Sequence, residues 1–249
     1  VRSPALLATM AVGLMFLPLV RRLGGRPVDA MVAFLLLQAT PLVLLGSAYL
    51  STDVVMAAAW VGAVWAAVAL TQGHRGGWWG LGVALGLGFL AKFPVVLALP
   101  AVLPALRQPR VRSQLATATP YLAAGLSLLL TAPVWIWALR HGGENILFQL
   151  AGRHTSRGLG VGYLVEMVGG VLLLATPFIA LAQVVAWARC WRRPDPGWSA
   201  LLVASATPVV FFALVALRTR VAPHWVAPTI LLGAVPLAMS RWRLRRPLI

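Results

Sequence analysis

Long apolar runs alternate with short polar connections along the whole chain. The apolar runs cover nine segments: 5–20, 28–47, 54–72, 78–90, 94–106, 114–131, 161–187, 198–217 and 224–240. Most of them approach the roughly 20 residues that a helix needs to cross about 30 Å of hydrocarbon. The pattern therefore predicts an all-α, polytopic transmembrane helical bundle that forms a single domain over residues 1–249.

Two of the apolar segments, 78–90 and 94–106, are too short to cross a bilayer by themselves. As helices, each would rise only about 20 Å. They flank Lys92, Phe93 and Pro94, which place a charge directly before a helix breaker. We interpret the two segments as a short hairpin whose tip does not reach far into water. Such a bend needs protein or a wet cavity around it.

Basic residues are concentrated in every second connection. The connections after the first, third, fifth, seventh and ninth segments hold most of the 21 lysines and arginines. Cytoplasmic loops of membrane proteins carry such an excess, so we predict that these connections and the C-terminus are cytoplasmic and that Val1 lies outside. The sequence thus indicates a multi-pass protein of the bacterial inner (cytoplasmic) membrane, in contact with membrane lipid.

The composition agrees with the bilayer as the solvent of this chain. Of its residues, 60% are hydrophobic and only 10% are charged, whereas a soluble domain has about 25% charged residues. The net charge of +16 does not indicate nucleic acid, because the basic residues form short clusters between apolar runs. The single cysteine, Cys190, excludes an internal disulfide and a cysteine-based metal site. Arginine far outnumbers lysine, and with abundant alanine, glycine and valine this indicates a bacterial source.

The remaining connections gather the polar residues that are suited to chemistry. They contain Asp53, Lys92, Arg140, His141, Glu144, Arg153, His154, Arg157, Arg218, Arg220 and His224. The longest connection, 132–160, is predicted on this side too. We therefore expect any reaction site at the outer face of the membrane.

Asp53 and Lys92 each allow a structural and a functional interpretation. Asp53 follows Ser51 and Thr52, and it either caps the start of a helix or supplies a carboxylate at a cavity between membrane and water. Lys92, the single lysine, either extends from a short helix end to the interface or binds a phosphate there. A cation inside an apolar hairpin usually has an anionic partner, and we favour phosphate as that partner.

The segment after Arg140 has the pattern of a helix that lies in the plane of the interface. Apolar residues recur at helical spacing over 146–151. Arg153 and Arg157 follow four residues apart, so on a helix they would face the same way and repel each other unless an anion lies between them. The alternative is a solvated turn that touches lipid head groups.

The run 217–225 is the most distinctive of the outer connections. Arg218 and Arg220 precede His224 and Trp225 at the entry to the last apolar segment. The run is either an interfacial belt of tryptophan and arginine or a clamp for a donor phosphate, with His224 near the leaving group. The chain has no P-loop, no glycine-rich dinucleotide motif and no HExxH zinc motif.

Four motifs in this order resemble the bacterial protein-mannosyltransferase-like and aminoarabinose-transferase-like glycosyltransferases. They are STDVVM at 51–56, GLGFLAKFPVVLALP at 86–100, PVWIWALRHGGENILFQL at 133–150 and APHWVAP at 222–228. The resemblance extends over roughly residues 5–240. It implies the GT-C fold, an interfacial helix on the outer face, and a sugar donor that is carried on a polyprenyl phosphate.

The same resemblance assigns roles to residues. Asp53 matches the second acidic position of the family and is assigned as catalytic, while Gly143 stands where the family has a tryptophan. Donor-phosphate binding is implied for Lys92, Arg153, Arg157, Arg218, Arg220 and His224, and acceptor or cavity contacts for His141, Glu144, His154 and Trp225. The family's main base is an aspartate after its first helix, and no acid precedes Asp29 here. We therefore expect the first helix, the first outer loop and the main catalytic base upstream of Val1.

The implied reaction is a direct displacement at the anomeric carbon, with inversion. A carboxylate deprotonates the acceptor and cations stabilise the leaving phosphate, so we expect no metal and no cofactor besides the lipid-linked co-substrate. Two alternatives stay open. One is a lipid or solute transporter in which the bend at Lys92 is a broken helix, although we find no internal repeat between the two halves. The other is a non-catalytic membrane subunit or fragment.

Overall fold

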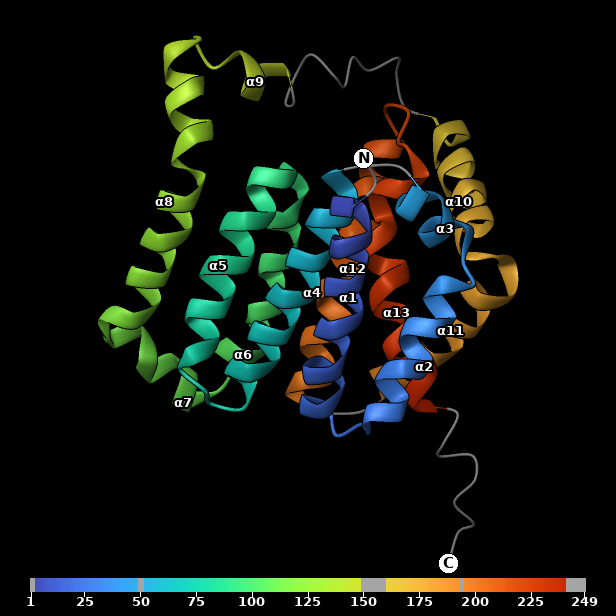
Figure 1. The fold of residues 1–249 in the computed structure, drawn as a ribbon, viewed down its shortest axis with the longest axis horizontal. Coiled ribbons are helices and arrows are strands. Elements are labelled where there is room, and N and C mark those ends of the chain that lie inside the picture. The colour runs from blue at the N-terminus through green and yellow to red at the C-terminus, as the bar shows by residue number, and fades with distance from the viewer. Residues whose placement is uncertain (1–2, 49–51, 149–159, 193–194, 241–249) are drawn as a thin grey trace, which may run out of the picture.

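The computed structural model describes residues 3–48, 52–148, 160–192 and 195–240, and every element in these ranges is a helix (Figure 1). In chain order the elements are α1 (Ser3–Arg22), α2 (Pro27–Gln38), α3 (Pro41–Ala48), α4 (Thr52–Thr71), α5 (Gly76–Ala91), η1 (Phe93–Val102), α6 (Leu103–Leu106), α7 (Pro109–Arg112), η2 (Ser113–Ala116), α8 (Ala118–Arg140), α9 (Glu144–Leu147), α10 (Gly162–Ala175), α11 (Pro177–Trp191), α12 (Pro196–Ala216), η4 (Pro223–Val226) and α13 (Ala227–Ser240). The elements labelled η are 3₁₀ helices.

Three of the described helices, α4, α8 and α12, are long and apolar enough to cross a membrane by themselves. The pair α10 and α11 passes the same test when it is taken together, which would give a fourth span. Helices α2 and α5 and the stretch from η1 to α6 are apolar but shorter. The prediction of an all-helical transmembrane bundle is confirmed, while the number of nine crossings stays a prediction.

The segment 161–187, which we predicted as one helix, is sharply bent in its middle. Helices α10 and α11 are bent by 98° at Thr176, whose φ of 61° is unusual for a residue with a side chain. Pro177 explains the break, because a proline disfavours the helical conformation in the residue before it. The new helix starts at Pro177, and Thr176 Oγ1 accepts a hydrogen bond from the Ile179 backbone N–H at 3.4 Å.

The segment 28–47 is likewise divided, into α2 and α3. Pro41 is the first residue of α3 and again accounts for the break before it. The Thr40 hydroxyl donates a hydrogen bond to the Leu37 carbonyl at 2.6 Å, which satisfies a carbonyl at the end of α2. Each of the two predicted segments is therefore divided into two helices rather than forming a single one.

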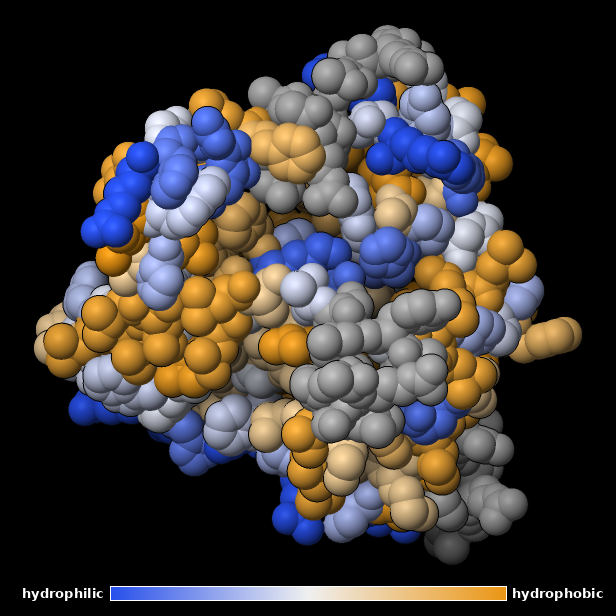
Figure 2. Space-filling view, turned by 45° about the horizontal axis from the view of Figure 1, so that its top comes forward, coloured by the Kyte–Doolittle hydropathy of each residue, from blue (hydrophilic) through white to orange (hydrophobic). Residues whose placement is uncertain are grey.

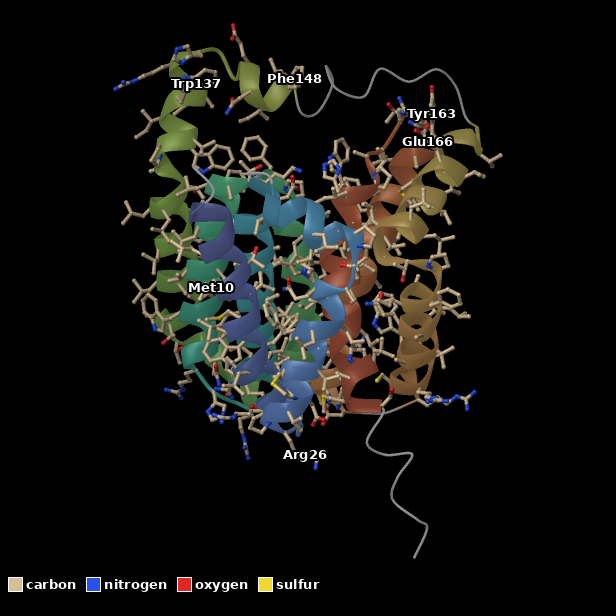
Figure 3. The ribbon with its side chains drawn as sticks, turned by 45° about the vertical axis from the view of Figure 1, so that its right-hand side comes forward. Met10, Arg26, Trp137, Phe148, Tyr163 and Glu166 are labelled. Carbon is tan, nitrogen blue, oxygen red and sulfur yellow. The ribbon has the colours of Figure 1, made fainter. Side chains whose placement is uncertain are left out.

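Connections lie at two opposite ends of the bundle, as the charge pattern predicted. The C-terminal ends of α1, α4, α11 and α13 lie at the lower end in Figure 1, and those of α5, α8 and α12 lie at the upper end. Figure 3 shows Arg26 at the lower end and Tyr163 and Glu166 at the upper end. We call the upper end, which carries the predicted chemistry, the outer end.

Helix α4 runs through the centre of the bundle. Of its apolar span, 67% is buried inside the protein, compared with 39% for α12 and 17% for α8. Trp60 is its largest buried side chain, and most of its other buried residues are alanine or valine. Small side chains let neighbouring helices approach closely, and α1, α5 and α12 all pack against α4. This packing fixes the first turn of α4, where Asp53 lies.

Helix α8 stands at the edge of the bundle and is longer than predicted. It continues to Arg140, beyond the predicted segment 114–131, so the long outer connection begins at residue 141 rather than 132. Its lower half packs on α5, where a Cβ added at Gly82 would lie only 3.0 Å from the Ala123 carbonyl carbon. Its upper half diverges from α5 (Figure 1) and contributes residues to a cavity at the outer end.

Candidate functional site

An ion pair between Lys92 and Asp53 lies at the outer end of the bundle. Lys92 Nζ donates a hydrogen bond to Asp53 Oδ1 at 2.5 Å, and the two side chains are 20% and 23% exposed. Asp53 is in the first turn of α4, and Lys92 lies between α5 and η1, 39 positions later in the sequence. The anionic partner that we expected for Lys92 is thus supplied by the chain itself.

The local sequence explains why Lys92 occupies this position. Its backbone is extended (φ −165°, ψ 129°), while its N–H still bonds to the Gly88 carbonyl at 2.8 Å. Pro94 cannot extend α5, so the chain turns at Lys92 into η1. Gly88 permits this close return, because a Cβ there would lie 2.6 Å from Val95 Cγ2. Helix α5 and η1 thus form the hairpin that the sequence predicted, with Lys92 at its tip.

Trp225 lies against the ammonium of Lys92. Its ring is 5.8 Å from Lys92 Nζ, within the range of a cation–π interaction, and its centroid is 5.4 Å from that of Phe212. Trp225 belongs to η4, the single turn that leads into α13. Three segments that are far apart in the sequence therefore meet at Lys92: the first turn of α4, the hairpin of α5 and η1, and η4.

Two cavities adjoin the ion pair, one at each residue. The first has a volume of about 360 Å³, and Asp53 and His224 line it among mainly apolar residues of α1 to α4, α10 and α13. The second has a volume of about 610 Å³ and is lined by Lys92 and Trp225 among residues of α5, η1, α8, α9 and α12. Figure 2 is turned toward the outer end and shows hydrophilic residues in a hollow between hydrophobic surfaces. The ion pair therefore places a carboxylate at one cavity and an ammonium at the other.

Aromatic side chains form much of the second cavity. Phe89 stacks on Phe93 with 4.8 Å between ring centroids, and on Trp135 with 5.5 Å. Helix α12 contributes two more phenylalanines and α9 an isoleucine. Sequence reasoning assigned no site role to these rings. The available signal was the placement of Phe89 and Phe93 on both sides of Lys92, at the tip of the predicted hairpin.

Arg220 forms a second ion pair at the outer end, with Glu166 of α10. Arg220 Nε donates a hydrogen bond to Glu166 Oε1 at 2.7 Å, and Nη2 donates to the same oxygen. The hydrogen bond with Glu166, and then its negative charge, raise the pKa of the Arg220 guanidinium. The sequence did not indicate this pairing across 54 positions. Arg220, which we expected at a donor phosphate, is thus held by a carboxylate of its own chain.

The other predicted site residues lie apart from Lys92 or outside the described residues. The His141 ring, at the end of α8, stacks on Trp137 with 4.2 Å between centroids. Glu144 begins α9, which covers the first part of the predicted interfacial helix. Neither these residues nor the exposed Arg218 are among those that line the two cavities. Three predicted residues lie outside the described ranges: Arg153, His154 and Arg157.

His224 and Trp225 are adjacent, yet they line different cavities. His224, for which we predicted a role at the donor phosphate, lines the cavity of Asp53. Trp225, for which we predicted an acceptor or cavity contact, lines the cavity of Lys92. The pair of residues thus reaches both sides of the site from one turn of helix.

Helix α10 packs directly on η4 at Gly170. A Cβ added at Gly170 would overlap the ring of Pro223, whereas one added at the neighbouring Gly169 would meet no atom within 4 Å. Because η4 also carries Trp225, the position of α10 affects the environment of Lys92.

We expect Gly170→Ala to displace η4 and to separate Trp225 from Lys92. Loss of a cation–π contact of roughly 0.5–1 kcal/mol should raise the reactivity of the Lys92 amine toward an acylating reagent about two- to fivefold. Mass spectrometry of the Lys92 peptide measures this rate, and Gly169→Ala is the matched control. Equal labelling of both variants and the unchanged protein would contradict the expectation.

The site contains a cation and a carboxylate that are joined by a hydrogen bond, and each of them lines a different cavity. The ammonium can stabilise negative charge that enters the second cavity, and the carboxylate can accept a proton from a group in the first. Among the described residues, no three His, Cys, Asp or Glu side chains lie close enough together to hold a metal ion.

Known proteins resemble this chain in sequence pattern and in fold. Residues 1–137 match the family model described as dolichyl-phosphate-mannose-protein mannosyltransferase. The crystal structure of ArnT from Cupriavidus metallidurans bound to undecaprenyl phosphate has a TM-score of 0.75 and 15% identity, over 97% of this chain and 46% of that chain. The apo structure of the same protein has a TM-score of 0.72 and 18% identity, over 97% and 45%.

These likenesses confirm that the chain has the predicted helical fold. The chain spans about half the length of the ArnT structures that it matches, 46% and 45%. A comparison with curated proteins gave no match.

Proposed function

The chain belongs to the dolichyl-phosphate-mannose-protein mannosyltransferase family, and from this premise we propose that it is a membrane glycosyltransferase. It moves a sugar from a polyprenyl-phosphate donor to an acceptor at the outer face of the membrane, with inversion at the anomeric carbon. The family supports sugar transfer from a lipid phosphate. The likeness to an ArnT structure with bound undecaprenyl phosphate supports the same class of lipid.

The observation that carries this proposal is the position of Lys92 in the wall of an aromatic, apolar cavity. An ammonium is a compact cation that suits a phosphate, and the rings and aliphatic side chains around it suit an isoprenoid chain. We assign the second cavity to the donor. We assign the first cavity, which Asp53 and His224 line, to the acceptor.

In the proposed reaction, a hydroxyl or amine of the acceptor attacks the anomeric carbon of the sugar. The bond between this carbon and the phosphate oxygen breaks, and its electron pair leaves with the polyprenyl phosphate. Lys92 stabilises the negative charge that develops on that phosphate. A carboxylate takes the proton of the acceptor, and Asp53 is the carboxylate that this chain places beside Lys92.

We further propose that the protein lies in the bacterial inner membrane with its C-terminus in the cytoplasm. Arginines gather at the lower end of the bundle, in the connections after α1, α4, α6 and α11. The excess of basic residues on cytoplasmic loops supports this orientation. A reporter fused after Arg246 tests it, and a periplasmic signal would contradict it.

A donor-binding experiment tests the function most directly. The protein in nanodiscs is titrated with polyprenyl phosphate and, separately, with the uncharged polyprenol of the same length. We expect the phosphate to bind about 10- to 100-fold more tightly, because a hydrogen bond to a charged group contributes roughly 1.5–3 kcal/mol. Release of polyprenyl phosphate from a labelled polyprenyl-phosphate sugar then measures turnover. Equal affinity for phosphate and alcohol would contradict the proposal.

A further inference from the structure

Asp53 and a donor phosphate would compete for the same ammonium, that of Lys92. We propose that Asp53 is a placeholder anion: the donor phosphate displaces it from Lys92, and the displaced carboxylate becomes available to the acceptor in the first cavity. This inference rests on the proposed function, because it assigns the donor phosphate to Lys92. It adds an order of events, in which donor binding precedes the release of the carboxylate from Lys92.

The surroundings of Lys92 require an anion at all times. Its side chain is only 20% exposed and lies at the tip of an apolar hairpin, with the ring of Trp225 beside it. A cation at the edge of the hydrocarbon is costly without a counter-charge. Asp53, which bonds to Nζ at 2.5 Å, meets this need before a phosphate arrives.

The carboxylate and the phosphate would contact Lys92 from the sides of two different cavities. Lys92 lines the second cavity and Asp53 lines the first, so a phosphate in the second cavity approaches the ammonium from a different side than the carboxylate. Two anions that share one ammonium repel each other. The phosphate offers oxygens that accept charge-assisted hydrogen bonds from the ammonium, and once it holds Nζ, Asp53 turns toward the first cavity.

The exchange couples the donor to the proton acceptor. As long as Asp53 Oδ1 holds Lys92 Nζ, one of the two carboxylate oxygens is engaged and the ion pair fixes the orientation of the carboxylate. Once the phosphate holds Nζ, the carboxylate can turn to present Oδ1 to a group in the first cavity, which Asp53 already lines. Binding of the donor phosphate to Lys92 thus also releases the carboxylate of Asp53. In this way the donor cavity and the acceptor cavity are coupled by the movement of one side chain.

Polyprenyl phosphate binding to single variants provides the test. Asp53→Asn removes the competing charge and should lower the Kd for polyprenyl phosphate about fivefold, the factor that corresponds to roughly 1 kcal/mol for a solvent-accessible ion pair. Lys92→Ala should raise the Kd. In the Lys92→Ala background, Asp53→Asn should have a smaller effect, because only the direct repulsion between the carboxylate and the phosphate remains.

Asp53 also lies in the first turn of α4, so its replacement can affect the helix start. Asp53→Ser is the second variant, because a serine hydroxyl serves well at a helix N-terminus. It should tighten binding of polyprenyl phosphate as Asp53→Asn does, and thermal unfolding in detergent shows that each variant is folded.

The outcomes separate this inference from the proposed function. If Lys92→Ala weakens binding but Asp53→Asn and Asp53→Ser bind polyprenyl phosphate with unchanged or lower affinity, the placeholder role is wrong and the donor site stands. If Lys92→Ala leaves the Kd unchanged, the donor site itself is wrong. Tighter binding by both Asp53 variants, with the larger gain where Lys92 is present, supports the placeholder.

Discussion

Lys92→Ala should lower the rate of sugar transfer about 10²- to 10³-fold, which is the loss that follows removal of one preorganised group that stabilises developing negative charge. Lys92 is the only lysine of the chain, and its ammonium faces the cavity that we assign to the donor. Its removal also abolishes the ion pair with Asp53. Initial rates of polyprenyl phosphate release, measured at saturating donor in membranes with equal amounts of protein, give the effect.

Two further variants identify the origin of that loss. Lys92→Arg keeps the positive charge but replaces a compact ammonium by a planar guanidinium, so we expect it to retain part of the activity. Arg140→Ala removes an exposed cation at the end of α8, away from both cavities, and should leave the rate unchanged. A Lys92→Ala protein that is as active as the unchanged protein would exclude the phosphate-stabilising role.

Gly82→Ala should destabilise the protein by about 1–3 kcal/mol, because it inserts a methyl group into a helix contact that has no room for it. The added Cβ would lie 3.0 Å from the Ala123 carbonyl carbon of α8 and still nearer to its oxygen. Backbone atoms cannot yield as a flexible side chain does, so α8 must move away from α5. We expect the midpoint of thermal unfolding in detergent to fall by roughly 3–10 °C.

Gly125→Ala is the matched control for this packing contact. It lies in α8, in the helix that Gly82 faces, and a Cβ there would meet no atom within 4 Å. Both variants gain the same helix propensity from alanine, so the difference between them isolates the overlap. Because α8 carries Trp135 into the second cavity, Gly82→Ala should also weaken polyprenyl phosphate binding. Equal midpoints for the two variants would show that α8 does not pack as the structure places it.

The sequence was sufficient to predict the two ends of the bundle. Arginine clusters recur at every second connection, and this periodicity depends on charge and chain order alone, without knowledge of packing. The hairpin at Lys92 was also predictable, because Pro94 stops one helix directly after a charged residue. These features are local in sequence, so they appear without a three-dimensional structure.

The breaks within the apolar segments 28–47 and 161–187 were harder to predict from the sequence. Pro41 and Pro177 mark them, but Pro133, Pro208 and Pro236 occur inside α8, α12 and α13 without ending those helices. Whether a proline ends a helix depends on its neighbours, which must satisfy the freed carbonyls. Apolar length alone therefore overestimated the continuity of two segments.

The partners of the charged residues were the part that sequence reasoning missed. Asp53 and Lys92 were each identified, but their pairing depends on α4 and the α5–η1 hairpin lying side by side. Glu166 had no predicted role, although it binds Arg220 across the gap between α10 and the loop before η4. Long-range pairs follow from helix packing, which the spacing along one chain does not encode.

The lining of both cavities depends on the rotation of the single turn η4 about its axis. Successive residues of a 3₁₀ helix point about 120° apart, which is how His224 and Trp225 come to line different cavities. Insertion or deletion of one residue before His224 would rotate both side chains by about 120° and remove at least one of them from its present cavity. Substitution of His224 or Trp225 therefore changes one cavity at a time. A change in the length of the stretch before His224 alters both cavities at once.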